Sequence, residues 1–369
     1  MTTINTNLLS INAQRNLQST QGALATSIQR LSSGLRINSA KDDAAGLAIS
    51  ERFSTQIRGL NVAVRNANDG ISLAQTAEGA LSSIGNNLQR IRELAVQSSN
   101  ATNSSTDREA LQKEVDQLIS EIQRVATQTE FNGTKLLDGS FTNQAFQVGA
   151  NAGQLISISN IANAQTDTLG EASFATSSPI TITATASEQF TINGVTIEAV
   201  TEQASAEEQA TALAAAINAK VGETRVFATV EGDEITLNGL KANEAITIGG
   251  TPPTGFVNVS PSSSATFVSD TDVSTFVGAQ RAIAVMDEAL TTINTARADL
   301  GAIQNRFSSV VQNLQINAEN LSASRSRILD ADFAAETAAL SRAQILQQAG
   351  TAMVAQANQL PQGVLALLR

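Results

Sequence analysis

The sequence LNVAVRNANDGISLAQTAEGALSSIGNNLQRIRELA, from Leu60 to Ala95, carries the clearest structural signal in this chain. Its apolar residues recur at steps of three and four, which predicts a long helix with a coiled-coil-like stripe. At about 1.5 Å per residue the helix is on the order of 50 Å long, so it needs other long helices to pack along. The stripe consists of Leu60, Val64, Ala67, Ile71, Ala74, Ala77, Leu81, Ile84, Leu88, Ile91 and Ala95.

Two other segments repeat this spacing. One runs from Leu111 to Val125, and we expect Thr106 and Glu109 to form a capping box at its start. The other lies far away in the sequence, from Ala279 to Leu314, and contains no proline. Segments from both ends of the chain are therefore predicted to bundle together.

The centre of the chain has the signature of β structure. An Asn-Gly pair at 132–133 and an Asp-Gly pair at 138–139 flank a short predicted strand. Residues 180–185 and 190–197 alternate with period two, and the Asn-Gly pair at 193–194 predicts a hairpin turn. Ser205 and Glu208 have capping-box spacing and predict one short helix in this region. Further strands are expected at residues 225–230, 234–237 and 245–248, and a linker at residues 251–264.

These patterns predict a mainly α fold with a β-rich insert. Both termini form a long antiparallel coiled-coil-like helical bundle, and the centre forms an α+β outer domain. The expected domains are a terminal coiled coil (1–44 with 325–369), a rod-like helical domain with a short β-hairpin region (45–170 with 271–324), and a surface-exposed α+β domain (171–270).

Composition argues against most catalytic chemistry. The 369 residues include no Cys, His, Trp or Tyr, which removes thiol nucleophiles, imidazole bases and His-ligated zinc. No phosphate-binding glycine loop or serine nucleophile motif is found, so we expect no catalytic residues, no cofactor and no metal. A formal net charge of -11 argues against nucleic acid as a partner.

Both ends of the chain carry unusually few charges. Residues 1–35 contain no acidic residue, and residues 343–368 contain no charge at all. Membrane-surface helices normally carry Lys or Arg, and no apolar run approaches the roughly 20 residues of a membrane span, so we expect no membrane insertion. The uncharged amphipathic faces instead predict packing between copies in an open helical assembly. The predicted self-assembly residues are Ile4, Leu8, Ile11, Leu17, Leu24, Ile28, Leu31, Leu346, Met353, Leu360, Leu365 and Leu368.

Several stretches resemble bacterial flagellin. They are Ile4–Leu17, Leu31–Ile49 (LSSGLRINSAKDDAAGLAI), Leu88–Val96, Thr129–Gly133 and Ser326–Phe333. The resemblance implies a self-assembling subunit of the flagellar filament, whose terminal segments line a central tube inside a rod-like layer.

The resemblance carries further expectations. Phe190–Val195 followed by Ala212–Ile217 resembles an insert motif of many flagellins and would lie on the filament exterior. The family also implies an extracellular location, type III export without a cleaved signal peptide, and four kinds of partner. These are further copies of the chain, a secretion chaperone, the filament cap and hook-filament junction proteins.

Two segments resemble flagellin regions that host innate immune receptors recognise. Residues 29–50 resemble the segment recognised by plant receptors, and other positions match contacts with a Toll-like receptor. The alternative is purely structural, with caps at a helix junction and solvated helix charges. The matching residues are Lys41, Asp42, Gly46 and Leu47 for the first segment, and Arg90, Leu94 and Glu114 for the second.

Three other functions compete with a filament subunit. A hook-filament junction protein shares the terminal motifs, a surface adhesin would act through the β-rich insert, and a hydrolase would need paired carboxylates in a cleft. As a separate matter, Asp330 and Asp332 suggest paired carboxylates for a cation, but two acids make a poor site because calcium usually takes about six or more oxygen ligands. We expect these two residues to cap a helix or to form a salt bridge between subunits.

Overall fold

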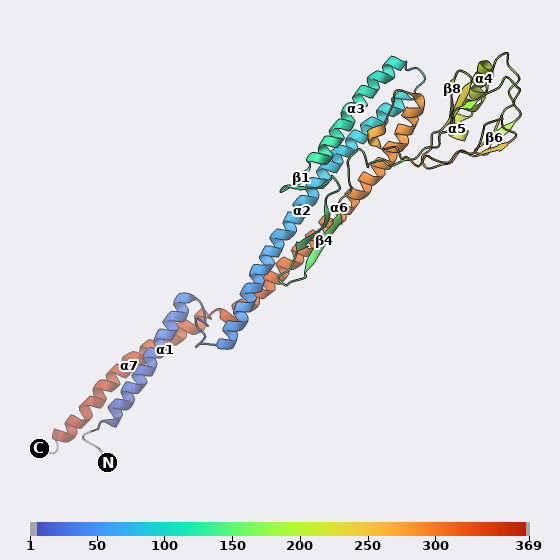
Figure 1. The fold of residues 1–369 in the computed structure, drawn as a ribbon. Helices are drawn as coiled ribbons and strands as arrows, with labels where there is room; N and C mark the ends of the chain where they lie inside the picture. The colour runs from blue at the N-terminus through green and yellow to red at the C-terminus, as the bar shows by residue number, and fades with distance from the viewer. Residues whose placement is uncertain (1–5, 367–369) are drawn as a thin grey trace. The chain divides into compact units, whose positions relative to one another are not determined.

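Long helices dominate the computed structural model, which describes residues 6–366, with only the backbone for residues 360–366 (Figure 1). The chain divides into two units. The first comprises residues up to Asn66, residues 147–154, and the chain from Val310 onwards; the second comprises residues 67–146 and 155–309.

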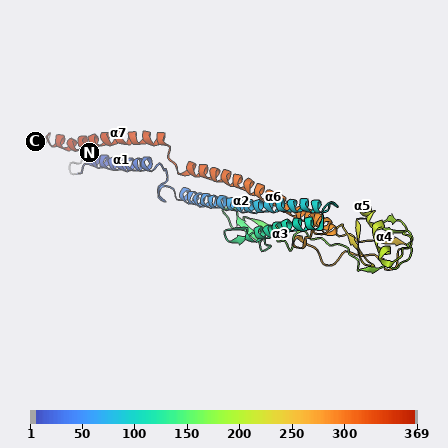
Figure 2. The same ribbon diagram turned by 90° about the horizontal axis from the view of Figure 1, so that it is seen from above.

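In the first unit, α1 (Leu8–Ser33) pairs with α7 (Phe333–Ala366) (Figure 2). The two helices are antiparallel, because Asn7 donates to the Ala357 carbonyl whereas Arg30 approaches Glu336. Both ends of the chain thus form one helical hairpin, as the sequence predicts.

The first unit also contains the start of α2 (Ala44–Ser98) and the end of α6 (Phe276–Leu329). Leu60, Ala63 and Leu314 form a small buried cluster between them. The connections from α1 to α2 and from α6 to α7 run side by side, because the Arg36 amide donates to the Leu329 carbonyl at 2.6 Å.

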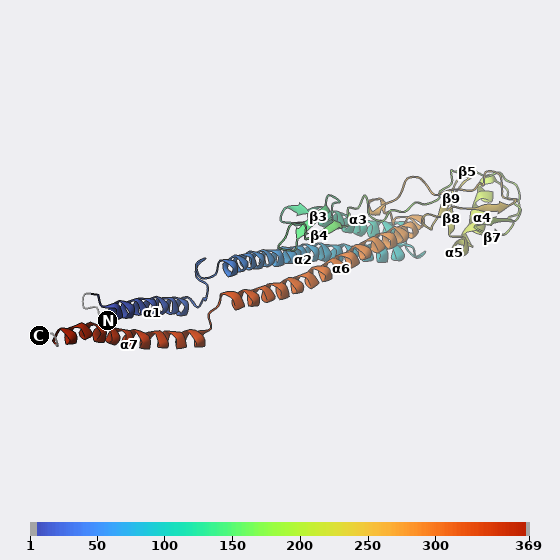
Figure 3. The same ribbon diagram turned by 90° about the horizontal axis from the view of Figure 1, so that it is seen from below.

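In the second unit, the rest of α2 lies beside α3 (Ser105–Gln128) and the first part of α6 (Figure 3). The predicted stripe on α2 is confirmed, since Leu81, Ile84, Leu88 and Ile91 are completely buried. The predicted capping box at the start of α3 is wrong. The helix begins earlier in the sequence, at a Ser104–Asp107 box with the same spacing.

Short strands follow α3 in the second unit. Strands β1 (Glu130–Phe131) and β2 (Thr134–Lys135) form the predicted hairpin, with positive φ at both turn residues. Strands β3 (Thr142–Gln147) and β4 (Leu155–Asn160) form a second two-stranded sheet. Strand β3 is largely exposed and has no apolar alternation, which explains why it was not expected, whereas β4 alternates between exposed and buried residues and was missed.

The insert has a hydrophobic core of its own, formed by two three-stranded sheets and α4 (Ala206–Asn218). The hairpin at residues 190–197 and the Ser205 cap of α4 are confirmed. One sheet has the order β10-β6-β7 and the other β5-β9-β8. The strands are β5 (Ile180–Thr181), β6 (Phe190–Ile192), β7 (Val195–Ile197), β8 (Val226–Glu231), β9 (Glu234–Gly239) and β10 (Ile248–Gly250), with the one-turn helix α5 (Val221–Thr224) before β8.

Two expectations for the insert need correction. The strand expected at residues 180–185 is confined to Ile180 and Thr181. These two residues pair with the start of β9, next to the Glu231–Glu234 turn, so β9 has no further residues with which a longer strand could pair. Residues 251–264 are more than a linker, because Phe256 is buried in the insert core and Val259 bridges to Ile246. Scattered apolar residues among Pro, Ser and Thr gave no periodic signal there.

Candidate functional site

Exposed large apolar side chains lie along both helices of the α1–α7 hairpin. Five of the predicted self-assembly residues are among them, with exposed fractions from 44% for Ile11 to 67% for Leu8. Three more large apolar residues, which the sequence reasoning missed, are equally exposed. We call this set the assembly face: Leu8, Leu9, Ile11, Ile28, Phe333, Ile345, Leu346 and Met353.

The remaining predicted self-assembly residues are not part of the assembly face. Leu17, Leu24 and Leu31 are half-buried in the hairpin, and a Cβ added to Gly350 of α7 would lie 3.1 Å from the Leu17 side chain. Leu17 therefore packs against α7 where a glycine leaves room for it. Ile4 and Leu368, and the side chains of Leu360 and Leu365, lie outside the described residues.

A polar cluster joins the two helices at the open end of the hairpin. The Asn7 side-chain amide donates to the Ala357 carbonyl at 2.7 Å, and the Ser10 hydroxyl donates to Asn358 Oδ1 at 2.6 Å. Ser10 is buried, and Gln14 also donates to it. Polar groups inside a helical pair disfavour other registers, because a shifted helix would leave them unpaired.

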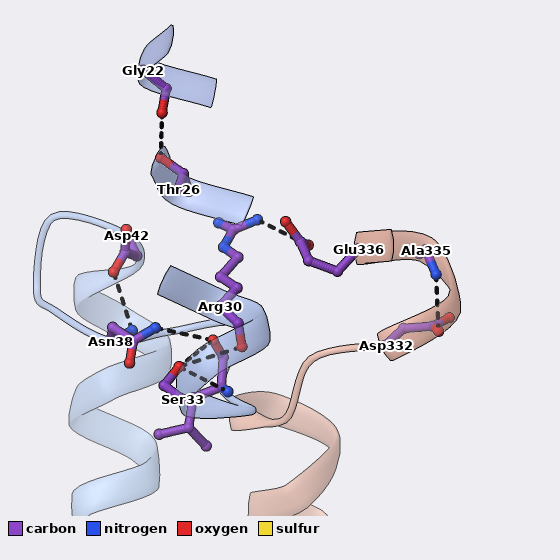
Figure 4. A network of polar contacts seen from close by, with 10 residues as sticks. Gly22, Thr26, Arg30, Ser33, Asn38, Asp42, Asp332, Ala335 and Glu336 are labelled. Atoms are coloured by element: carbon purple, nitrogen blue, oxygen red, sulfur yellow. Dashed lines mark hydrogen bonds and ion pairs between the residues drawn. The ribbon is translucent and has the colours of Figure 1, made fainter. Parts of the chain in front are cut away.

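An ion pair closes the opposite end. Arg30 Nη1 lies 3.8 Å from Glu336 Oε2, and both side chains are partly buried (Figure 4). Glu336 is in the first turn of α7, where a negative charge is favourable. The cluster at Ser10 and the pair at Arg30 together fix which turns of α1 and α7 face each other.

The turn between α1 and α2 is built around Asp42. Its carboxylate accepts hydrogen bonds from the Ser39 hydroxyl and from the amides of Ser39 and Asn38, which holds the pKa of Asp42 below its usual range (Figure 4). Asp43 accepts from the Gly46 amide at 2.8 Å, the geometry of a helix N-cap. Asp42 and Asp43 therefore have the capping role that the sequence predicts at this helix junction.

The other receptor-related residues of this turn differ in accessibility. Lys41 is exposed and Leu47 is half-buried. Gly46 is buried, and a Cβ there would lie 2.7 Å from Ile37 Cδ1. A side chain at position 46 would therefore disturb the junction itself.

Arg90 is the centre of a charge network between α2 and α3. Its guanidinium lies 2.8 Å from Glu114 and 3.1 Å from Glu93, and these hydrogen bonds raise the pKa of Arg90, with Glu114 the larger cause. Arg90 and Glu114 are both exposed enough to contact a partner. Leu94 is only 1% exposed, so it supports this surface from the core and is not part of it.

Asp330 and Asp332 do not converge on a cation. Asp332 accepts from the amides of Ala334 and Ala335 and caps α7, while Asp330 accepts from the Ser326 hydroxyl (Figure 4). Among the described residues, no three Asp or Glu side chains gather closely enough to hold a metal ion. Nor does any helix in the described part combine the length and apolarity needed to cross a membrane.

Comparison with protein families gives two matches. Residues 4–142 match the bacterial flagellin N-terminal helical region, and residues 283–368 match the bacterial flagellin C-terminal helical region. Residues 143–282, which neither family model matches, contain the insert with its separate core.

Individual relatives match over almost the whole chain. Flagellin B of Vibrio cholerae is 42% identical over 379 residues, with 99% of each chain covered. B-type flagellin of Pseudomonas aeruginosa is 40% identical over 487 residues, covering 100% of this chain and 99% of its own. The solved structure of FliC from Burkholderia pseudomallei is 31% identical and covers 64% of this chain and 99% of its own, with a TM-score of 0.39. This chain belongs to the bacterial flagellins and is a structural subunit of the flagellar filament.

Proposed function

We propose that the assembly face of one copy packs against the α1–α7 hairpins of neighbouring copies in the filament. The single observation that carries this proposal is the exposure of eight large apolar residues on helices whose ends are nearly free of charge. Each such side chain contributes roughly 1.5–3 kcal/mol when it is fully buried. A face of this kind is unfavourable in water and becomes favourable between copies.

The hairpin contacts support the same proposal. Contacts at Ser10, Arg30 and Leu17 hold α1 and α7 in one register, so every copy presents the same apolar pattern. Open helical growth requires the same heterologous contact to be repeated from copy to copy, and this needs one uniform surface on every copy. In this proposal residues 1–44 and 325–369 line the central tube, residues 45–170 and 271–324 surround them, and residues 171–270 lie outside.

Cysteine accessibility tests this packing, because the chain contains no Cys and each engineered thiol is unique. Ile345→Cys places a thiol on the assembly face, and Ser263→Cys places one on the exposed surface of the insert. A thiol reagent is expected to modify both variants rapidly in the free chain. After seeded polymerisation, only the Ser263→Cys thiol should stay reactive. Equal reactivity of Ile345→Cys in free and polymerised protein would contradict the proposal.

Other expected partners follow from membership of this family. We infer that the chain leaves the cell through the flagellar type III apparatus without a cleaved signal peptide, bound beforehand by a secretion chaperone. It then meets the filament cap and the hook-filament junction proteins. Flagellin relatives are structural proteins of the extracellular filament, and we infer that this chain likewise catalyses no reaction.

Recognition by host receptors is a second proposed role of the free chain. The exposed Arg90–Glu114 pair supports a Toll-like receptor contact, and Lys41 with Asp42 supports recognition by plant receptors. In the plant segment, Gly46 and Leu47 shape the turn rather than extend from it.

Replacing Arg90 with alanine is expected to reduce Toll-like receptor signalling sharply while the fold remains intact. Exposed ion pairs such as Arg90–Glu114 contribute little to stability, because water and salt screen them. Arg124→Ala is a matched control, because Arg124 is an exposed arginine of α3 that pairs with Glu121. Receptor reporter activity should fall for Arg90→Ala and not for Arg124→Ala. An unchanged response to both variants would rule out the contact.

A further inference from the structure

Three Asn-Gly pairs occur in the second unit, and their surroundings differ greatly. They begin at Asn132, Asn193 and Asn238. Asn-Gly pairs can undergo deamidation, in which the glycine amide nitrogen attacks the asparagine side-chain carbonyl carbon and ammonia leaves. Glycine favours this ring closure because it has no Cβ to hinder it. A folded structure permits the reaction when it leaves the asparagine side chain and the glycine amide free, and prevents it when it holds them in hydrogen bonds.

We propose that Asn132 is a site of spontaneous deamidation in this protein, whereas Asn193 and Asn238 are protected. Asn132 is exposed, and within the described residues its side-chain amide makes no hydrogen bond. The Gly133 amide, the attacking group, also donates to no described residue. A Cβ placed on Gly133 would meet nothing within 4 Å, so the turn has space for a ring.

Asn193 has the same sequence and the same positive-φ turn, but its side chain is held on both sides. Its Nδ2 donates to the Thr224 carbonyl at 2.9 Å. Its Oδ1 accepts from the Thr247 amide at 2.8 Å and from the Thr247 hydroxyl at 3.2 Å. All three hydrogen bonds must break before the carbonyl carbon can turn toward Gly194.

Asn238 is protected in a different way. It is buried in β9, and its side-chain amide donates to Thr229 and to the Thr236 carbonyl. The Gly239 amide donates to the Ala175 carbonyl at 2.7 Å, so the attacking nitrogen is itself engaged. Reaction at this pair requires local opening of the sheet.

The reaction is balanced by one water molecule. The Gly133 nitrogen loses its proton and bonds to Asn132 Cγ, the bond from Cγ to the amide nitrogen breaks, and ammonia carries that proton away. Water then opens the succinimide ring at either carbonyl, which gives aspartate or isoaspartate. Isoaspartate lengthens the main chain inside a two-residue turn and disturbs the pairing of Phe131 with Thr134.

The new carboxylate also changes a surface cavity. Asn132 lines a depression of about 670 Å³ together with Asp69, Phe131, Phe141 and Phe146. Deamidation therefore adds a negative charge to a lining that already contains Asp69, and the lengthened main chain of isoaspartate is expected to loosen the turn as the protein ages.

Peptide mapping of the full-length chain tests the proposal. The folded protein is incubated at mildly alkaline pH, and mass spectrometry with isoaspartate detection follows all three sites over time. Asn132 is expected to react on the order of a hundredfold faster than Asn193, which corresponds to about 2.8 kcal/mol at 1.4 kcal/mol per tenfold. Comparable rates at Asn132 and Asn193 in the folded chain would overturn the proposal.

Two controls distinguish the effect of the fold on the deamidation rate from the effect of the neighbouring sequence. In concentrated urea the three sites should react at similar rates, and a persisting excess at Asn132 would show that neighbouring residues, not the fold, set the difference. Asn132→Gly keeps a residue suited to positive φ and removes the reactive amide. The isoaspartate signal should disappear in this variant, and its persistence would exclude Asn132 as the source.

Discussion

Replacing Met353 with glutamate is expected to abolish seeded polymerisation at concentrations where the parent chain assembles readily. Met353 is 64% exposed on α7, so the free chain loses little packing. In the proposed packing the same position becomes an interface, where residues 343–368 supply no positive charge and residues 1–35 supply only Arg15 and Arg30. Taking an unpaired charge out of water costs several kcal/mol.

The effect should appear as a large rise in critical concentration. At about 1.4 kcal/mol per tenfold change, a penalty of several kcal/mol raises it by on the order of a hundredfold or more. Sedimentation after adding short filament seeds measures this directly, and circular dichroism of the free chain checks that its helices are retained.

Two control variants test whether the loss of polymerisation depends on both the charge and its position. Met353→Leu keeps an apolar side chain of similar size and should polymerise normally. Ser263→Glu adds the same charge to the exposed surface of the insert and should also polymerise. Normal assembly by Met353→Glu would show that this part of α7 is not an interface between copies.

Helix-forming segments could be predicted because their periodicity is long and uninterrupted. The stripe from Leu60 to Ala95 specifies one buried face over many turns, and the buried residues of α2 follow it. The residues at which helices begin and end were harder to predict. Ser104 with Asp107 and Thr106 with Glu109 have the same capping spacing, and only the packed structure shows which pair starts α3.

The assembly face could be predicted only in part. Apolar residues surround much of α1 and α7, and the sequence does not reveal which of them face the partner helix. Leu17 and Leu24 turned out to pack inside the hairpin, while Leu9 and Ile345 are exposed. That division depends on the register between helices more than three hundred residues apart, which Asn7 and Ser10 help to set.

The insert illustrates a different limit of sequence reasoning. Its hairpin at residues 190–197 and its helix α4 have strong local signals, and both are confirmed. Its isolated bridges, such as Thr176 to Asn238 and Ile246 to Val259, join distant residues without any repeating pattern. The bridge to Val259 and the burial of Phe256 make residues 251–264 part of the insert core, and no local rule could predict them.

The separate core of the insert leads to a prediction about Phe190. This residue is buried in the insert core, with its ring 5.6 Å from that of Phe256. Phe190→Ala is expected to destabilise the insert by about 3–5 kcal/mol, because truncating a buried phenylalanine leaves a cavity. Stabilities of whole domains are only about 5–15 kcal/mol, so the insert should be partly unfolded at elevated temperature.

Unfolding of the insert should leave polymerisation largely intact. Phe190 is not part of the assembly face, and the contacts of Arg281 of α6 with the insert, to the Gly239 carbonyl at 3.0 Å and to Thr176 at 2.8 Å, do not involve the α1–α7 hairpin. Limited proteolysis of Phe190→Ala should cut first within residues 171–270, whereas Val257→Ala, a truncation at an exposed site, should resist like the parent chain. If Phe190→Ala also loses seeded assembly or its long helices, the insert is an essential part of the rod and not a separately stabilised addition to it.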